Sequence, residues 1–261
     1  MVVAIDIGNT SISFGVLQRE RVIRTFSTEV QVPKRILRAQ CGKILQKIGK
    51  RFPNIECVVI CSVVPGVLAV CRRAVSDRLR VRAIVIGQDI KVPMRNNYRN
   101  PKQVGQDRLV CAYAAKCLYG QPAIVVDFGT ATTFDVVSPR GSYEGGIIVS
   151  GIRLSAEALF QKTALLPRIS LMKGPRALIG KNTQESILSG IFHGYGAMSC
   201  GLIERISRRI KGSPKVIVTG GYTRLMKQYI SKKTTIIDKH LVFKGIALVL
   251  SQSRRNSTLK F

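Results

Sequence analysis

The chain has 261 residues, 46% of them hydrophobic and 6% aromatic, which is enough apolar material for one large or two compact domains. This composition excludes a disordered chain, and apolar runs such as 57–64 are far shorter than the roughly 20 residues that span a bilayer. Its 42 Lys and Arg residues outnumber 14 Asp and Glu residues, for a formal net charge of +28. No export signal precedes the first predicted strand, and the seven cysteines form no CxxC pair. We therefore expect a cytoplasmic protein with reduced core thiols and no membrane anchor.

The positive charge is spread along the whole chain, for example at Arg72-Arg73, in the 205–211 segment and at Arg254-Arg255. No basic block is interleaved with aromatic residues, and no helix-turn-helix, RRM or KH signature is present. A basic surface attracts any polyanion through screened long-range forces. The sequence therefore predicts no specific nucleic-acid binding, and it leaves the partner of the basic surface open.

Apolar runs of strand length alternate with amphipathic helical segments in the first half, which is the pattern of an α/β fold. The predicted elements are strands at 2–6 and 11–17 joined by a tight turn, a helix at 34–50, a strand at 57–63, a helix at 65–79, a strand at 83–86, a loop at 88–104 and a helix at 107–118.

The start of the chain is repeated in its second half. The segment 3–9, Val-Ala-Ile-Asp-Ile-Gly-Asn, matches 124–130, Ile-Val-Val-Asp-Phe-Gly-Thr, and apolar residues with Ser or Thr follow each copy. Two such copies predict a duplicated fold, with domains at 1–117 and 118–261. The later predicted elements are a turn at 139–141 and a strand after it, helices at 151–162 and 183–211, a strand at 215–218, a helix at 222–230, a strand near 235–237 and a helix from 241.

The repeated Asp-x-Gly segments favour a phosphate site. The glycine lets a phosphate approach main-chain N–H groups, and an Asp at a strand end can bind the accompanying cation. The alternative is an ordinary Asp-Gly hairpin turn, but two copies at Asp6 and Asp127, both within apolar strands, favour the functional interpretation. A P-loop is excluded, because five residues separate Gly174 from Gly180 and Asn182 follows Lys181.

Paired Asp-x-Gly turns of this kind resemble those of the actin, sugar-kinase and Hsp70 superfamily. The resemblance implies two duplicated ribonuclease-H-like (actin-like ATPase) domains, each a mixed sheet flanked by helices. Within that superfamily the chain resembles the type III pantothenate kinases over 6–221. The motifs that carry this likeness are Asp-Ile-Gly-Asn-Thr at 6–10, Tyr98 ahead of Asn100-Pro101, Gly-Gln-Asp-Arg at 105–108, Asp-Phe-Gly-Thr-Ala-Thr at 127–132, Gly-Gly-Ile-Ile at 145–148, Gly-Lys-Asn-Thr at 180–183 and Thr-Gly-Gly at 219–221.

The resemblance implies an activity and roles for individual residues. The chain would phosphorylate pantothenate to 4′-phosphopantothenate with ATP, the first step towards coenzyme A. Asp107 would be the catalytic base and Arg108 would bind the pantothenate carboxylate; the alternatives are a helix N-cap and a surface arginine. Thr183 would reach pantothenate from the partner subunit of a homodimer. The implied substrate-binding residues are Tyr98, Gly105, Gln106, Asp107, Arg108 and Thr183, and the implied ATP-binding residues are Asp6, Ile7, Gly8, Asn9, Thr10, Ser11, Ile12, Ser13 and Thr130.

The resemblance also implies cofactors. Asp127 matches the family's ligand for a monovalent cation, K⁺ or NH₄⁺, and Mg²⁺ would accompany ATP. The nucleoside would pass 219–221. The chain departs from the family pattern at Ser150-Gly151, where a proline usually precedes the glycine. That proline shapes a turn and contributes no reacting group.

Two other functions are compatible with the same fold. One is a non-catalytic accessory protein related to transcription, which a basic surface would suit. The other is a phosphotransferase acting on a sugar or acetate. The intact carboxylates Asp6, Asp107 and Asp127 argue against the first, and Tyr98 together with the 105–108 motif argues against the second.

Overall fold

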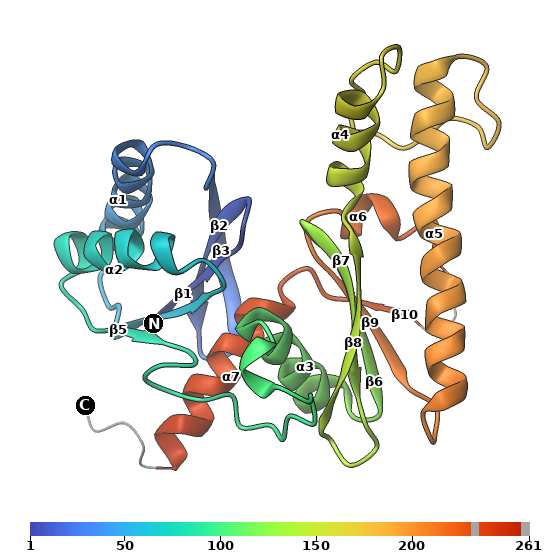
Figure 1. The fold of residues 1–261 in the computed structure, drawn as a ribbon. Helices are drawn as coiled ribbons and strands as arrows, with labels where there is room; N and C mark the ends of the chain where they lie inside the picture. Colours follow the sequence, from blue (N-terminus) through green and yellow to red (C-terminus); the bar gives the residue numbers. More distant parts are fainter. Residues whose placement is uncertain (231–234, 257–261) are drawn as a thin grey trace. The chain divides into compact units, whose positions relative to one another are not determined.

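The computed structural model describes residues 1–230 and 235–256, which form two compact units (Figure 1). Unit 1 contains residues 1–95, 99–114 and the described residues from His240 onwards. Unit 2 contains residues 96–98 and the described part of 115–239.

The sheet of unit 1 is mixed and has the strand order β3-β2-β1-β4-β5. The first three strands form an antiparallel meander, and β4 and β5 continue parallel to β1. The strands are β1 (Val2–Ile7), β2 (Ser11–Gln18), β3 (Arg21–Glu29), β4 (Cys57–Ser62) and β5 (Ala83–Val85). The helices that lie in this unit or begin in it are α1 (Lys34–Arg51), α2 (Pro65–Leu79), the 3₁₀ turn η1 (Pro101–Gln103), α3 (Gln106–Tyr119) and α7 (Leu241–Arg255).

Unit 2 repeats this topology. Its sheet has the order β10-β9-β6-β7-β8, in which β6 takes the place of β1 and β9 the place of β4. Its strands are β6 (Ala123–Phe128), β7 (Ala131–Val137), β8 (Tyr143–Ser150), β9 (Lys215–Thr219) and β10 (Thr235–Ile237). Its helices are α4 (Ile152–Lys162), α5 (Thr183–Arg209) and α6 (Thr223–Met226). The predicted fold class, two mixed sheets flanked by helices, is confirmed.

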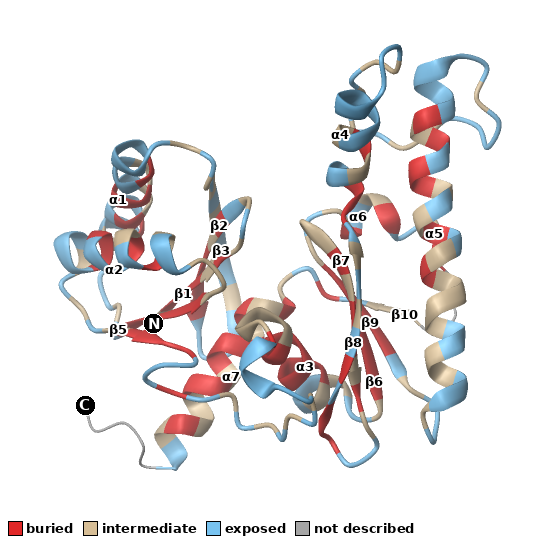
Figure 2. Ribbon diagram, in the orientation of Figure 1, coloured by how far each residue is buried: buried red, intermediate tan, exposed pale blue. Residues whose placement is uncertain are grey.

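Strand alternation explains why both faces of the first sheet are covered. Val3 and Ile5 of β1 lie in one core cluster with α1 and α2, which pack side by side, whereas Ala4 lies in another cluster with α7 (Figure 1). Figure 2 shows the same pattern as buried strands beneath helices that are buried along one stripe. The sheet can be apolar on both sides only because helices remove both faces from water.

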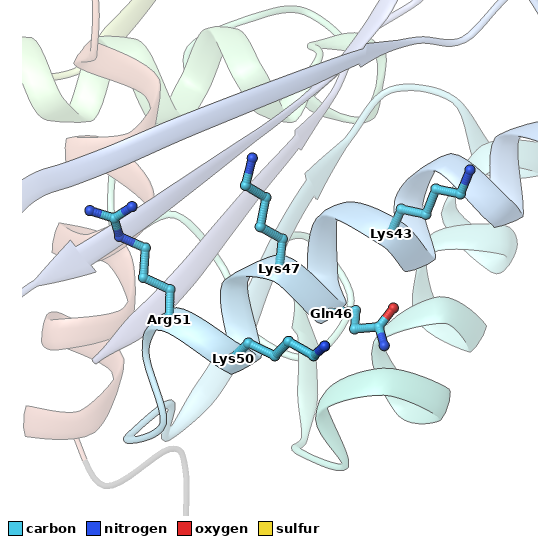
Figure 3. A pocket seen from close by; sticks show the side chains of 5 residues that line it. All are labelled: Lys43, Gln46, Lys47, Lys50 and Arg51. Atoms are coloured by element: carbon cyan, nitrogen blue, oxygen red, sulfur yellow. The ribbon is translucent and has the colours of Figure 1, made fainter.

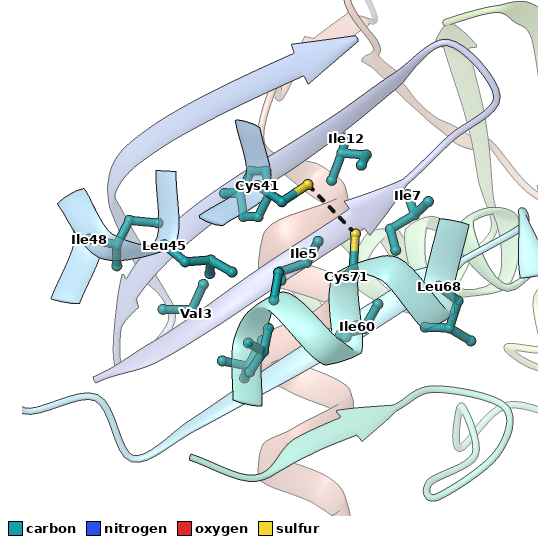
Figure 4. Close-up of a cluster of buried hydrophobic side chains, with 14 of the residues drawn as sticks. Val3, Ile5, Ile7, Ile12, Cys41, Leu45, Ile48, Ile60, Leu68 and Cys71 are labelled. Atoms are coloured by element: carbon teal, nitrogen blue, oxygen red, sulfur yellow. Dashed lines mark hydrogen bonds between the residues drawn. The ribbon is translucent and has the colours of Figure 1, made fainter. Parts of the chain in front are cut away.

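The cysteines are part of this core. None of the seven, all of which lie within the described residues, forms a disulfide, and five of them are buried. Cys41 of α1 and Cys71 of α2 meet in the first cluster with their sulfur atoms 4.0 Å apart (Figure 4). They act there as small apolar side chains.

The core of unit 2 lies between its sheet and α4, α5 and α6. Ile124, Val126 and Phe128 of β6 contribute one set of buried side chains. Ile152 from α4 and Phe192 from α5 contribute others. The helices α4 and α5 also contact each other.

The structure differs from the sequence-based elements in two places and adds a detail about α7. Strand β3 was not predicted, because most of its side chains are exposed and carry no apolar alternation. Helix α6 is shorter than the predicted 222–230. By contacts α7 belongs to unit 1, because its apolar face packs on β1, β2 and β4 and the ring of Phe243 lies over Gly15.

Among the described residues, α5 is the one helix with the length and mean hydropathy (1.2) needed to cross a membrane. Only 28% of that apolar window is buried, and the core helix of a soluble protein can pass the same test. The sequence analysis predicted this helix at 183–211 but not a membrane span, because glycines, serines and a histidine interrupt its apolar residues.

The α3–α7 contact yields a stability prediction. Gly245 of α7 is buried, and a Cβ there would lie 2.5 Å from the carbonyl oxygen of Val110 on α3. Gly245→Ala should therefore lower the free energy of unfolding by about 1–3 kcal/mol, the usual cost of overpacking. The matched control is Gly66→Ala in α2, where a Cβ meets nothing within 4 Å. The control should leave stability unchanged or raise it by up to about 1 kcal/mol. Equal urea midpoints for both variants would contradict this account of the packing.

Candidate functional site

In unit 1 the first Asp-x-Gly turn follows β1 directly. Asp6 is opposite Ser13 of β2 and Cys61 of β4 in the sheet. The Gly8 N–H donates to the Ser11 carbonyl oxygen over 3.0 Å and closes the turn. Asn9 and Ser11 are exposed, so the turn offers polar groups to a ligand at the carboxyl end of the central strand.

The Gly-Gln-Asp-Arg segment meets the same end of the sheet. A Cβ on Gly105 would lie 2.5 Å from Oδ1 of Asp107 and 3.3 Å from Cγ1 of Val63. Val63 in turn donates its N–H to the carbonyl oxygen of Ile7 at the end of β1. Glycine at 105 therefore leaves room both for the Asp107 carboxylate and for the Val63 side chain just after β4.

The side chain of Gln106 packs on Gly87, just after β5. Gly87 follows β5 with φ +89°, and a Cβ on it would lie 2.9 Å from Cδ of Gln106. The start of α3 thus rests on chain that leaves β4 and β5, while Asp6 sits at the end of β1. Ligands of α/β proteins bind outside the carboxyl ends of parallel strands, which is where these motif residues gather.

The pKa of the Cys61 thiol depends on burial and on the carboxylates of Asp6 and Asp107. Burial raises the pKa of Cys61 well above its usual value, and the charges of Asp6 and Asp107 raise it further. Asp6 lies opposite Cys61 in the sheet. Gly105, which the Asp107 carboxylate approaches, packs on Val63 two residues after Cys61. Both carboxylates therefore lie at this end of β4, although about 100 residues separate them in the sequence. The structure brings together the two acidic residues that the sequence assigned to the phosphate turn and to the base.

Burial also raises the pKa of Asp107 itself. The N–H of Arg108, which donates to Asp107 Oδ1 over 2.8 Å, and the charge of Arg108 oppose that rise. A raised pKa makes the ionised carboxylate a stronger proton acceptor. Asp107 also lies in the first turn of α3, where a carboxylate is stabilised by the helix dipole.

In unit 2 the second Asp-x-Gly turn lies between two glycines. A Cβ on Gly220 would contact Oδ1 of Asp127 and lie 2.6 Å from the backbone of Phe128. A Cβ on Gly151 would lie 2.6 Å from the carbonyl oxygen of Gly129 and would also contact that of Thr130. Three motifs distant in the sequence therefore converge on this turn.

Hydrogen bonds hold the segment in which the family's proline is absent. The hydroxyl of Tyr195 donates to the carbonyl oxygen of Ser150 over 2.7 Å. The hydroxyl groups of Ser150, Ser155 and Tyr195 lie within 2.6–3.0 Å of one another. These contacts from α4 and α5 supply a restraint of the kind that a proline ring would otherwise impose.

Tyr98 belongs to unit 2 and lies on β8. The preceding Asn97 donates its N–H to the carbonyl oxygen of Tyr143 over 2.9 Å, and its side chain bonds Glu144. Gly145 has φ +114°, and a Cβ on it would lie 3.4 Å from the Tyr98 ring. The aromatic ring therefore has a fixed support on the sheet.

The sequence analysis did not identify Asp135, the carboxylate that holds Tyr143 beside Tyr98. Asp135 of β7 is 1% exposed and accepts hydrogen bonds from the hydroxyl of Tyr143 over 2.8 Å and that of Thr133 over 3.0 Å. Its one sequence signal is an Asp inside an apolar strand, the same signal that marked Asp6 and Asp127. Asp135 locks Tyr143, whose ring centroid lies 6.5 Å from that of Tyr98.

Thr183 is exposed at the first turn of α5. A capping box fixes this turn: the side chain of Asn182 accepts from the Glu185 N–H over 2.9 Å, and Glu185 accepts from the Lys181 N–H over 2.8 Å. The Gly-Lys-Asn-Thr motif is thus a helix start.

Cation binding by the described residues would depend on oxygen atoms. Within residues 1–230 and 235–256, no cluster of three or more His, Cys, Asp or Glu side chains is arranged to hold a metal ion. Around Asp127, the carboxylate and the carbonyl oxygens of Gly129 and Thr130 gather at one turn. Such a set suits a hard cation and not a transition metal.

Comparison with known proteins assigns the family. The sequence profile described as type III pantothenate kinase matches residues 2–209. The chain belongs to the type III pantothenate kinase family. The type III pantothenate kinase of Halalkalibacterium halodurans is 38% identical over 255 residues, which cover 97% of this chain and 100% of that protein.

Solved structures with the same fold are more distant from this family member. The ROK family glucokinase of Streptomyces griseus, in complex with glucose and AMPPNP, superposes with a TM-score of 0.53 at 13% identity, covering 97% and 99% of the two chains. Component A of (R)-2-hydroxyglutaryl-CoA dehydratase from Acidaminococcus fermentans gives 0.55 at 11% identity, covering 98% of each chain. These similarities support the fold.

The raised pKa of Asp107 makes a prediction about stability. The folded chain binds the Asp107 proton more tightly than the unfolded chain, so the ionised carboxylate destabilises the fold once the pH rises above the unfolded pKa. Asp107→Asn removes that penalty and should raise the free energy of unfolding at neutral pH. In urea titrations the difference should shrink towards acidic pH, where the carboxyl is protonated in both states.

Asp77 is the matched control for this measurement. The Arg38 hydrogen bond lowers the pKa of Asp77, so Asp77→Asn should decrease stability slightly at neutral pH. A destabilised Asp107→Asn variant at neutral pH would show that burial is not the dominant influence on that carboxylate.

Proposed function

We propose that this family member transfers the γ-phosphoryl group of ATP to the primary hydroxyl of pantothenate, with Asp107 as the base. Family membership supports both substrates. The observation that carries the residue assignment is the joint position of Asp6 and Asp107 beside Cys61 at the carboxyl end of the first sheet. A purely binding protein would not need a buried carboxylate with a raised pKa next to a phosphate turn, and no observation favours the accessory role.

The residues define a sequence of events. Asp107 accepts the proton of the pantothenate hydroxyl while the hydroxyl oxygen forms a bond to the γ-phosphorus of ATP. The bond from that phosphorus to the oxygen bridging the β- and γ-phosphates breaks, and ADP leaves. The turn at Asp6–Ser13 would hold the ATP phosphates through polar groups other than the Gly8 N–H, which is bonded to Ser11. Asp6 would hold the accompanying Mg²⁺ directly or through water. Mg²⁺ neutralises charge on the phosphates when it is bound. Because phosphoryl transfer proceeds through a loose transition state, positioning and charge neutralisation supply most of the catalysis.

The pantothenate and cation roles extend this proposal to unit 2. Arg108 would pair with the pantothenate carboxylate, and Tyr98 would line its pocket on the support made by Gly145 and Tyr143. Asp127, with the carbonyl oxygens beside it, would hold K⁺ or NH₄⁺, while Thr130 would contact the ATP phosphates. The carbonyl oxygens of Gly129 and Thr130 in the same turn as the Asp127 carboxylate support this cation site.

We further infer that the enzyme is a homodimer whose α5 helices pack together. Gly190, Gly194 and Gly201 lie on one stripe of α5, and a Cβ on any of them would meet nothing within 4 Å. Thr183 lies seven residues before Gly190 and so falls on the same stripe. Exposed apolar side chains in and beside α4 add to this surface, namely Leu154, Leu159, Phe160 and Leu165. A second copy would cover surface that a monomer leaves in water. The lack of a disulfide among the seven described cysteines supports a cytoplasmic location.

The base assignment is tested by the activity of Asp107→Asn. Its kcat for pantothenate phosphorylation should fall by about 10²- to 10⁴-fold, the usual contribution of a general base, while the KM for ATP changes little. Asp77→Asn, an exposed acid-to-amide control on α2, should retain wild-type activity.

The cation role is tested by running the same assay with potassium and then with sodium as the monovalent cation, and activity should require potassium. Folded wild-type protein that forms no product in either salt would refute the proposed reaction.

The shared site is tested by mixing two inactive variants. Thr183→Glu would place a negative charge against the pantothenate carboxylate, and Asp107→Asn removes the base. If Thr183 serves the partner subunit, reassociated mixtures contain one intact site per heterodimer and should recover about a quarter of wild-type activity. Gln184→Glu, an exposed neighbour turned away from the stripe, is the control and should stay active. Recovery no greater than the average of the two parents would place Thr183 in its own subunit's site or in neither.

A further inference from the structure

Helix α1 is unusually cationic for a helix on the outside of a small domain. It contains no acidic residue and seven basic ones, which are Lys34, Arg35, Arg38, Lys43, Lys47, Lys50 and Arg51. Its first turn holds cations where the helix dipole favours carboxylates, and Lys43, Lys47 and Arg51 repel one another at four-residue spacing. Stability alone does not account for this pattern.

The cations and the apolar residues of α1 occupy different faces. Leu37, Leu45 and Ile48 are buried in the core against the sheet. The second half of the helix turns Lys43, Lys47 and Lys50 to solvent. These charges are therefore not needed to attach α1 to its unit.

The exposed residues enclose a hollow of about 510 Å³ on the surface of unit 1. It is lined by Lys43, Gln46, Lys47, Lys50 and Arg51, and Figure 3 shows their side chains spread along the helix with Gln46 among the cationic ones. The lining contains no carboxylate. A ligand in the hollow would meet four positive charges and one amide.

Little in the described chain compensates these four charges. Arg38 forms an ion pair with Asp77 at 2.7 Å, but no ion pair involves any lining residue of the hollow within the described ranges. The ammonium group of Lys47 lies 5.8 Å from the ring centroid of Phe26 on β3, which orients it without neutralising it. The hollow thus carries a net positive charge that a polyanion would complement.

The side chains on the outer face of α1 suit a nucleic-acid strand better than a membrane surface. A helix that binds a membrane surface places apolar side chains into the lipid, whereas the apolar stripe of α1 is used in the core. Cations four residues apart on a helix are separated by roughly 6 Å along its axis, so they form a row suited to successive phosphates of a strand. Phosphate contacts made by Lys and Arg carry no base information.

We propose that the outer face of α1, from Lys43 to Arg51, binds the phosphate backbone of single-stranded nucleic acid without sequence preference. This surface is separate from the catalytic residues of unit 1, because α1 covers a face of the sheet while Asp6 and Asp107 lie at its carboxyl end. Binding and catalysis are therefore independent properties of the chain, and the proposal does not rest on the kinase activity.

The test is fluorescence anisotropy of a labelled oligouridylate with full-length protein over a range of salt concentrations. The variant Lys43→Gln/Lys47→Gln/Lys50→Gln removes three charges and keeps good helix formers in α1. The slope of log K against log salt should become shallower by about 2, since each lost phosphate contact on a single strand contributes about 0.7. Affinity at low salt should fall by about tenfold or more.

The matched control removes three exposed cations elsewhere in unit 1, as Arg72→Gln/Arg73→Gln/Lys91→Gln. It should keep the wild-type slope, and both variants should keep pantothenate kinase activity, which reports correct folding. If the α1 variant does not fold, Lys50→Gln alone should lower the slope by about 0.7. Equal losses in both variants would show attraction by total charge and overturn the site. No binding by the wild type, or binding to vesicles with anionic lipid but not to RNA, would overturn the proposed partner.

Discussion

The structure depends on backbone segments that approach each other where a side chain would not fit. At the carboxyl end of the first sheet, the Asp107 carboxylate and the Val63 side chain after β4 both approach Gly105. In unit 2, Gly151 and Gly220 let two segments close on the turn after Asp127. These glycines fix the position of each carboxylate by packing, and the position does not depend on a ligand. A preorganised site of this kind loses little free energy in reorganisation when the reaction occurs.

The opposing influences on Asp107 explain how a strongly basic chain can keep a carboxylate with a raised pKa. A net charge of +28 stabilises carboxylates at long range, which would make them weaker proton acceptors. Burial acts in the other direction and dominates at Asp107, while exposed Asp77 follows its neighbouring arginine. Local desolvation therefore decides the proton affinity of Asp107, and water screens much of the remote charge.

Much of the fold could be predicted from the sequence because the sheets are apolar on the faces that helices cover. The duplicated strands around Asp6 and Asp127 predicted a repeated fold and located both turns. Strand β3 lacked a signal because it is an edge strand with exposed residues, and its pairing with β2 is visible only in three dimensions. Asp135 was missed for another reason: its role depends on strand register, which brings the hydroxyl of Tyr143 to it across the turn between β7 and β8. The convergence of Gly151 and Gly220 on one turn likewise follows from chain connections that no local pattern encodes.

The position of α7 has a consequence for how the chain matures during synthesis. Unit 2 is almost continuous in sequence and lies entirely upstream of His240, whereas unit 1 needs Phe243 and Ile246 of α7 to cover Ala4 and Val59 on its sheet. The strands made first on the ribosome therefore keep one apolar face open to water until the final helix emerges. During that interval the nascent N-terminal sheet is the part of the chain most exposed to aggregation and to capture by chaperones.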